Sequence, residues 1–151
     1  MANTQALCSS FKAEILQGIH NLGTGVVRAA TTADVLKAAL YVTTATVNAA
    51  TTAYSGVNEV SGTGYTAGGV TVTNATAPAV SGTGAIWTPS ASLVYSSVTL
   101  STAFDTVLIY NSSQGNRAIS VHTFGAQTVT AGTFTLTMPA NATGTALLQV
   151  I

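Results

Sequence analysis

The sequence predicts an all-β protein, an antiparallel β-sandwich or jelly-roll-like domain that follows an amphipathic N-terminal helix. After Gly25, short runs of β-branched residues are separated by Gly, Ser, Asn and Pro, a pattern typical of sandwiches and barrels. Several of these runs alternate apolar and hydroxyl side chains, as half-buried strands do. A convincing helical pattern occurs once, over residues 5–22. We therefore divide the chain into an N-terminal helical arm, residues 1–24, and a β domain, residues 25–151.

The predicted helix rests on a single stripe of apolar residues. These follow one another at intervals of four, four, four and three positions: Leu7, Phe11, Ile15, Ile19 and Leu22. Such spacing places all of them on one face of a helix, and an apolar face needs a surface that covers it. Gly23 provides a natural end to this helix.

Three segments are predicted as strands from their local pattern. Residues 34–43 end in Tyr-Val-Thr, which Thr44 follows, and lack a helical C-cap, which favours a strand over a helix. Residues 70–73 and 133–138 alternate between apolar and hydroxyl side chains. Successive side chains of a strand point to opposite faces, so we expect both segments to expose a face of threonines.

The second half of the chain predicts a buried hairpin. Residues 107–110 are continuously apolar, as in a central strand, and a polar loop connects them to the strand pattern of residues 118–124. The apolar C-terminus, residues 146–151, is expected to pair within the sheet or against a neighbouring subunit. The repeated Val-Ser-Gly-Thr-Gly at residues 60–64 and 80–84 is interpreted as two turns in similar positions of adjacent hairpins.

The composition excludes several classes of function. Charged residues make up 5% of the chain, against about 25% in an ordinary soluble domain, and the formal net charge is zero. A protein that binds nucleic acid by neutralising phosphates needs a basic surface, which this composition cannot supply. No apolar run approaches the roughly 18 residues of a membrane-spanning helix. Cys8 is the single cysteine, so an internal disulfide is excluded.

Motifs for catalysis or cofactor binding are weak. Residues 62–67 formally match the dinucleotide fingerprint G-x-G-x-x-G/A, but a strand pattern follows where a phosphate site needs a helix N-terminus. The chain has no G-x-S-x-G elbow, and His20 and His122 are interpreted as structural residues. The four carboxylates are isolated in sequence, so neither a metal site nor a paired-carboxylate mechanism is expected. We therefore expect no enzymatic activity and no cofactor.

Large amphipathic side chains remain as candidates for contacts. Trp87 and the five tyrosines are interpreted as core or interface anchors, with a sugar-binding platform as the alternative. Arg117 is expected to anchor an ion pair, within the protein or across a contact. The candidate interface residues are those of the helical stripe (Leu7, Phe11, Ile15, Ile19 and Leu22) together with Tyr65, Trp87 and Arg117.

Four sequence blocks carry a resemblance to a known family. They are residues 6–21 (ALCSSFKAEILQGIHN), 37–41 (KAALY), 59–69 (EVSGTGYTAGG) and 109–118 (IYNSSQGNRA). In this order they resemble a family of small structural proteins of tailed bacteriophages, and the similarity extends over nearly the whole chain. The resemblance implies a virion component and brings no catalytic residues with it.

From these observations we expect a capsid decoration or cement protein that binds the major capsid protein as a homodimer or homotrimer. The alternative is a collar, tail or head-fibre component that contacts the host surface, for example as a carbohydrate-binding adsorption module. The first residues show no basic leader followed by an apolar block, so we expect synthesis in the host cytoplasm and a final place on the capsid exterior. Neither nucleic acid nor a membrane is expected as a partner.

Overall fold

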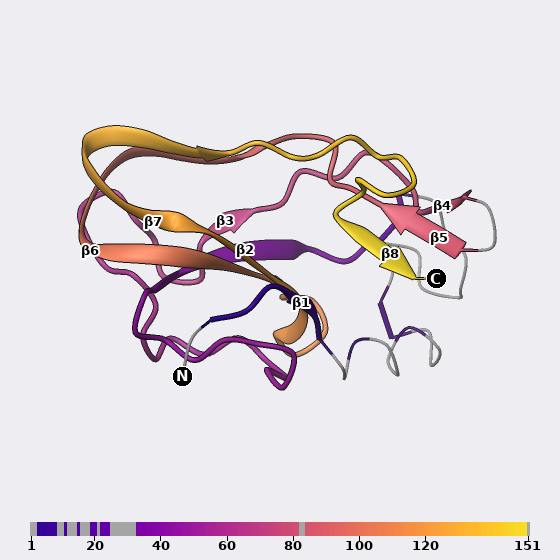
Figure 1. Cartoon of the computed structure of the whole chain (residues 1–151), viewed down its shortest axis with the longest axis horizontal. Coiled ribbons are helices and arrows are strands. Elements are labelled where there is room, and N and C mark those ends of the chain that lie inside the picture. The colour runs from indigo at the N-terminus through magenta and orange to yellow at the C-terminus, as the bar shows by residue number, and fades with distance from the viewer. Residues whose placement is uncertain are drawn as a thin grey trace.

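The computed structural model describes residues 3–8, 11, 15, 19–20, 22–24, 33–81 and 84–150. The strands in this part of the chain form two antiparallel sheets (Figure 1). They are β1 (Ala6–Leu7), β2 (Leu36–Val42), β3 (Val70–Thr71), β4 (Ala79–Ser81), β5 (Gly84–Trp87), β6 (Leu93–Asn111), β7 (Arg117–Leu136) and β8 (Leu148–Val150). One sheet has the strand order β1-β7-β6-β2-β3 and the other the order β4-β5-β8. A predominantly β protein, as predicted, is confirmed.

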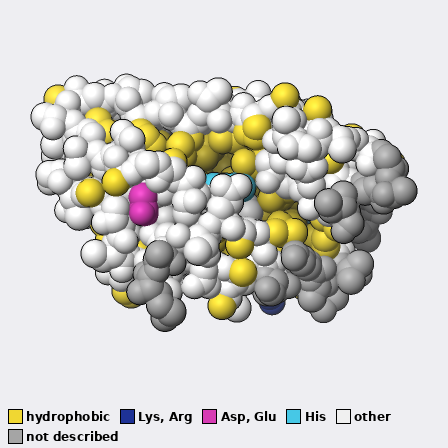
Figure 2. Space-filling model, viewed as in Figure 1, with side chains coloured by type: hydrophobic (Ala, Val, Ile, Leu, Met, Phe, Trp, Pro, Cys, Tyr) yellow, Lys and Arg dark blue, Asp and Glu magenta, His cyan; other side chains and the backbone are white. Residues whose placement is uncertain are grey.

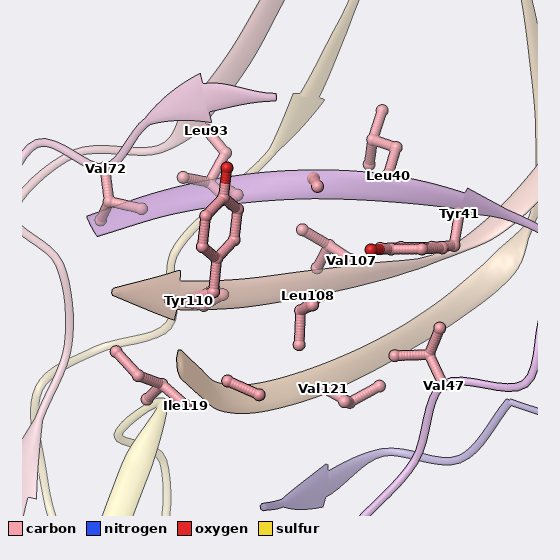
Figure 3. Close-up of a cluster of buried hydrophobic side chains, with 14 of the residues drawn as sticks. Leu40, Tyr41, Val47, Val72, Leu93, Val107, Leu108, Tyr110, Ile119 and Val121 are labelled. Atoms are coloured by element: carbon pink, nitrogen blue, oxygen red, sulfur yellow. The ribbon is translucent and has the colours of Figure 1, made fainter. Parts of the chain in front are cut away.

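β6 is the central strand of the larger sheet, as the continuous apolar run at residues 107–110 predicts. It pairs with β2 on one side and with β7 on the other, and this stretch of the strand is buried. The loop after β6 reverses the chain so that Ile109 lies opposite Ser120 of β7. The predicted hairpin is therefore confirmed. Figure 3 shows Leu108 and Val121 on one face of the sheet, whereas Leu40 of β2 points to the opposite face, and all three side chains are buried.

The β6–β7 hairpin is long, and it bends back over itself (Figure 1). The register between the two strands shifts at several points from Tyr95 to Thr106, which marks β-bulges, and bulges bend a strand. Ser97 in β6 and Ala131 in β7 have positive φ angles of 54° and 47°, a conformation uncommon for residues other than glycine. Local distortions of the backbone therefore produce the bend.

The bend divides the hairpin into two arms. In the upper arm, residues 93–95 pair with residues 134–136, and in the lower arm, residues 106–111 pair with residues 117–123. Figure 1 shows the two arms one above the other, with β2 beside the lower arm. The exposed and half-buried positions alternate along the upper part of β7, which confirms the threonine face predicted there.

β2 confirms the strand predicted over residues 34–43, and it contacts both arms. Ala38 has a small side chain, so the upper arm can approach β2 closely. Tyr95 of that arm donates a hydrogen bond of 2.9 Å to the carbonyl oxygen of Ala38. On the other side of β2, Lys37 lies opposite Thr71 of β3. Residues 70–73 alternate between covered valines and exposed threonines, as predicted.

The prediction of a helix over residues 5–22 is wrong for its first residues. Ala6–Leu7 forms strand β1 and pairs with β7. The Asn3 side chain holds this segment, because its Oδ1 accepts a hydrogen bond from the backbone N–H of Val47 (3.0 Å) and its Nδ2 donates one to Asp105 (2.9 Å). Pairing with backbone groups of β7 outweighs the helical periodicity of these first residues. Most later positions of the predicted helix lie outside the described residues, and that part stays a prediction.

The two Val-Ser-Gly-Thr-Gly segments occupy different positions, so the prediction of similar turns is wrong. In the second segment, Ser81 pairs with Gly84 in the β4–β5 hairpin. The first segment lies beside β6, where Thr63 forms an isolated bridge with Thr99. A Cβ atom on Gly62 would lie 2.0 Å from the carbonyl oxygen of Thr99, so the contact requires glycine. A close approach of two backbones therefore explains the apparent dinucleotide fingerprint.

The apolar C-terminus pairs within the chain, which is one of the two predicted alternatives. β8 lies beside β5, with Leu148 opposite Trp87. The indole Nε1 of Trp87 donates hydrogen bonds to the side-chain oxygen of Asn74 (3.2 Å) and to the carbonyl oxygen of Thr76 (3.1 Å). Trp87 is 2% exposed and is therefore a core residue of this chain.

Candidate functional site

The tyrosines of the chain converge on one carboxylate. Glu59 lies between β2 and β3, and its Oε2 accepts a hydrogen bond of 2.7 Å from Tyr54. Its Oε1 accepts hydrogen bonds of 2.7 Å from the Tyr65 hydroxyl and from the backbone N–H of Gly68. The Tyr65 hydroxyl also accepts a hydrogen bond of 3.0 Å from the backbone N–H of Leu40 in β2. These bonds fasten the loop that carries Glu59 to the main sheet.

The other three tyrosines surround the same carboxylate. Tyr110 stacks on Tyr54 and Tyr95 on Tyr65, with ring centroids 4.7 Å and 6.1 Å apart. Burial raises the pKa of Tyr41 to about 12, and the nearby carboxylate acts in the same direction. The same two causes raise the pKa of the other four phenols. All five hydroxyls are therefore protonated near neutral pH, and the cluster acts as a set of hydrogen-bond donors.

A second polar cluster holds the loop between β6 and β7. The buried Asn111 donates a hydrogen bond of 2.8 Å from Nδ2 to Oδ2 of Asp34, and its Nδ2 also lies 3.1 Å from Nδ1 of His20. The Oδ1 of Asn111 accepts hydrogen bonds from the backbone N–H groups of Ser113 (3.1 Å) and Gln114 (3.2 Å). Gln114 donates a further bond of 3.0 Å to Asp34. Each bond of this cluster joins the loop to the segment that precedes β2 or stabilises the loop itself.

His122 faces a groove between the two arms of the hairpin, which we call the interlayer groove. Its Nε2 lies 2.9 Å from Oγ of Ser120. Burial lowers the pKa of His122 to about 4, so the imidazole is neutral near pH 7. The groove has a volume of about 110 Å³ and is lined by Leu93, Val107, Ile109, His122, Thr123, Phe124, Leu136, Thr137, Met138, Pro139 and Leu147. Figure 2 shows a hollow with hydrophobic walls and a histidine on this side of the molecule.

Four of the candidate interface residues meet around a different cavity. Phe11, Ile15, Leu22 and Trp87 line an apolar space of about 380 Å³ beside the β4-β5-β8 sheet. Phe11 is 1% exposed, and Ile15 and Leu22 are half-buried and pack against the core. These residues direct most of their apolar surface toward the interior of the chain.

The remaining candidates lie elsewhere. Ile19 and Arg117 line a shallow depression beside the loop between β6 and β7. Leu7 is half-buried in β1, and Tyr65 is bound to Glu59. The structure therefore does not gather the eight candidates into one surface.

The described surface is almost free of charge. Among the five charged residues of the described ranges, Arg117 is exposed and Asp34, Lys37, Glu59 and Asp105 are half-buried. Asp105 accepts hydrogen bonds from Asn3 (2.9 Å) and Thr106 (2.8 Å). From Ala118 to the C-terminus the chain contains no charged residue. After Arg117, the outer surface of β7 therefore consists of neutral side chains.

β7 also presents an open edge that the sequence analysis did not identify. β1 pairs only with Ser120 and Val121, and within the described ranges no other strand pairs with β7 on this side. Residues 125–128 are exposed, as are Thr133 and Thr135. The available signal in the sequence is the long uncharged stretch that follows Arg117.

Within the described ranges, no three His, Cys, Asp or Glu side chains gather in a way that could hold a metal ion. No helix in the same ranges has the length and hydropathy needed to cross a membrane. Among known proteins, no family model matches the chain, and no curated protein or solved structure matches it at a significant level.

Proposed function

We propose that this chain is a non-enzymatic structural component of a tailed-bacteriophage virion. Its role is that of a decoration or cement protein, which binds the outer face of the major capsid shell as a small homo-oligomer. The observation that carries the proposal is the uncharged exterior of β7 after Arg117. A surface with little net charge favours association, and the buried centres of protein interfaces are depleted of charged residues.

The resemblance to phage structural proteins supports the same role. Its block at residues 59–69 contributes Glu59, Tyr65 and Gly68 to the tyrosine cluster. Its block at residues 109–118 contains the loop that Asn111 holds. The blocks that carry the resemblance therefore coincide with the two hydrogen-bond clusters that fix the loops of the main sheet.

The aromatic residues give no support to the alternative of a carbohydrate-binding module. A sugar platform needs exposed aromatic faces, whereas Trp87 is buried and its Nε1 bonds to Asn74 and Thr76. The hydroxyls of the half-buried Tyr54 and Tyr65 bind Glu59 of the same chain.

For the fold, we propose a β-sandwich in which the bent hairpin supplies strands to both layers. The hydrogen bond from Tyr95 to Ala38 joins the upper arm to β2, as expected for two facing layers. A jelly roll consists of eight strands in two Greek keys. Here β4, β5 and β8 form a separate small sheet, which favours the sandwich.

The copy number of the protein in purified particles tests the proposed role. Symmetry relates stoichiometry to location, so a shell protein should be present in hundreds of copies, whereas about a dozen or fewer would indicate the collar, tail or fibres. Quantitative mass spectrometry against the major capsid protein provides this number. Complete absence from the particles would contradict a virion role.

A second measurement separates cement from passive decoration. Particles that lack the protein should lose their genome at a lower temperature than complete particles. Addition of the purified protein should restore the original temperature, because many weak repeated contacts reinforce the shell together. Equal thermal stability of the two kinds of particle would contradict the cement role and leave decoration alone.

A further inference from the structure

We propose that the open edge of β7 around Thr135 pairs with the same edge of a second copy of this chain. The result is a two-fold symmetric dimer formed by β-strand addition. This inference rests on the proposed homo-oligomeric role and assigns the surface that forms the oligomer.

The first argument is the unpaired backbone of β7. In the upper arm β6 pairs with one side of the strand, and the other side has no neighbouring strand among the described residues. An open edge presents a row of N–H and C=O groups that serves as a template for another strand. Thr133 and Thr135 are exposed, so the outward face of this segment is open to solvent.

The second argument is that the segment of β7 around Thr135 has little of the protection against pairing that edge strands usually have. Natural edge strands carry charged residues, proline or bulges that prevent pairing with another chain. β7 has no charged residue after Arg117 and no proline. The bulges of the hairpin begin beyond Tyr95 and Phe134. The pairs from Leu93 with Leu136 to Tyr95 with Phe134 follow one another without a register shift, so this short part of the edge is regular.

The third argument is that the segment is complementary to itself. If Thr135 lies on the two-fold axis of an antiparallel pair, it faces Thr135 of the second copy. Phe134 then faces Leu136 of the second copy, and Leu136 faces its Phe134. Threonine pairs and aromatic–aliphatic pairs both stabilise neighbouring strands, and here no like charges meet.

The fourth argument is the interlayer groove. Phe124 and Leu136 of β7 line this groove, together with Met138, which follows the strand. Its volume of about 110 Å³ is well below the roughly 300 Å³ at which pockets for drug-sized ligands begin. A strand added to the upper arm extends that layer and places its alternate apolar side chains over the groove. A second copy supplies both the backbone edge and those side chains.

The experiment compares the wild-type chain with Thr135→Lys by size-exclusion chromatography and light scattering. Lysine at this position points to the solvent in one chain but faces a second lysine in the proposed pair. We expect a dimer for the wild type and half of that mass for Thr135→Lys. Thr44→Lys is the matched control, because Thr44 is exposed in a turn far from β7 in sequence, and it should remain a dimer.

A folding readout makes the comparison decisive. Circular dichroism and the emission of Trp87 should be the same for both lysine variants and the wild type. If Thr135→Lys fails to fold, hydrogen exchange of the wild type tests the same contact, because amides on the open edge should become protected as the concentration rises.

Three results would each overturn the inference. They are a Thr135→Lys variant that stays dimeric, a wild type that is monomeric, and edge amides that exchange freely at every concentration. The copy number in particles is a separate result, so a virion protein that fails these tests keeps its role and loses only this contact.

Discussion

The rings of Phe124 and Phe134 lie 5.4 Å apart, although the two residues are ten positions apart in the same strand. In a straight strand this separation would be about 33 Å, so the distance measures how far β7 bends back. Phe104 of β6 contacts both rings, with centroids 6.0 Å and 4.9 Å away, and is fully buried. The three phenylalanines join the two arms of the hairpin.

Replacement of Phe104 by alanine should destabilise the protein strongly. We expect a loss of about 3–5 kcal/mol in the free energy of unfolding, because a large buried side chain leaves a cavity. Phe124→Ala is the matched comparison and should cost clearly less, since Phe124 is half-buried. Urea denaturation followed by Trp87 fluorescence measures both values. Equal losses for the two variants would contradict a central role for Phe104.

Glu59 should stabilise the fold through its hydrogen bonds. Glu59→Leu removes the acceptor of Tyr54, Tyr65 and the Gly68 backbone N–H, and we expect it to cost at least about 2–3 kcal/mol. Glu59→Gln retains one acceptor oxygen and should cost less. Thermal denaturation of both variants tests the difference. If Glu59→Leu proved as stable as the wild type, the cluster would have no structural importance.

His122 should make the stability depend on pH. Its pKa is near 6.5 in an unfolded chain and about 4 in the folded protein, where burial disfavours the charged form. Below pH 6.5 the unfolded state therefore binds a proton that the folded state does not. Stability that is fully present above pH 6.5 should fall by up to about 3 kcal/mol as the pH approaches 4.

The His122→Leu variant provides the control for this prediction. Urea denaturation at a series of pH values should show a smaller decline between pH 6.5 and pH 4 than in the wild type. An identical decline in both proteins would assign the pH dependence to other groups.

Two glycines with positive φ should differ sharply in their tolerance of alanine. A Cβ atom on Gly69 would lie 1.7 Å from the carbonyl oxygen of Ala38, whereas a Cβ on Gly115 would have nothing within 4 Å. Gly115→Ala should therefore cost only the backbone strain, about 1–2 kcal/mol. Gly69→Ala has to displace β2 as well and should reduce stability by more than about 4 kcal/mol or prevent folding. Similar stabilities of the two variants would show that the loop moves away from β2 without cost.

The sequence by itself determined the class of the fold and several of its strands. Alternation at residues 70–73 and 133–138 and the apolar run at residues 107–110 are local patterns, and local patterns report which side of a strand is covered. The scarcity of charge, which underlies the proposed function, is also a property of the sequence alone.

Only the tertiary structure decided how these elements are used. Ala6–Leu7 became a strand because β7 offered backbone partners. Glu59 gathers tyrosines from β2, β6 and the loop between β2 and β3. The bend of the hairpin brings together the residues that line the interlayer groove. Each of these features depends on contacts between residues far apart in the chain. A local sequence pattern does not show which distant residues will make such contacts.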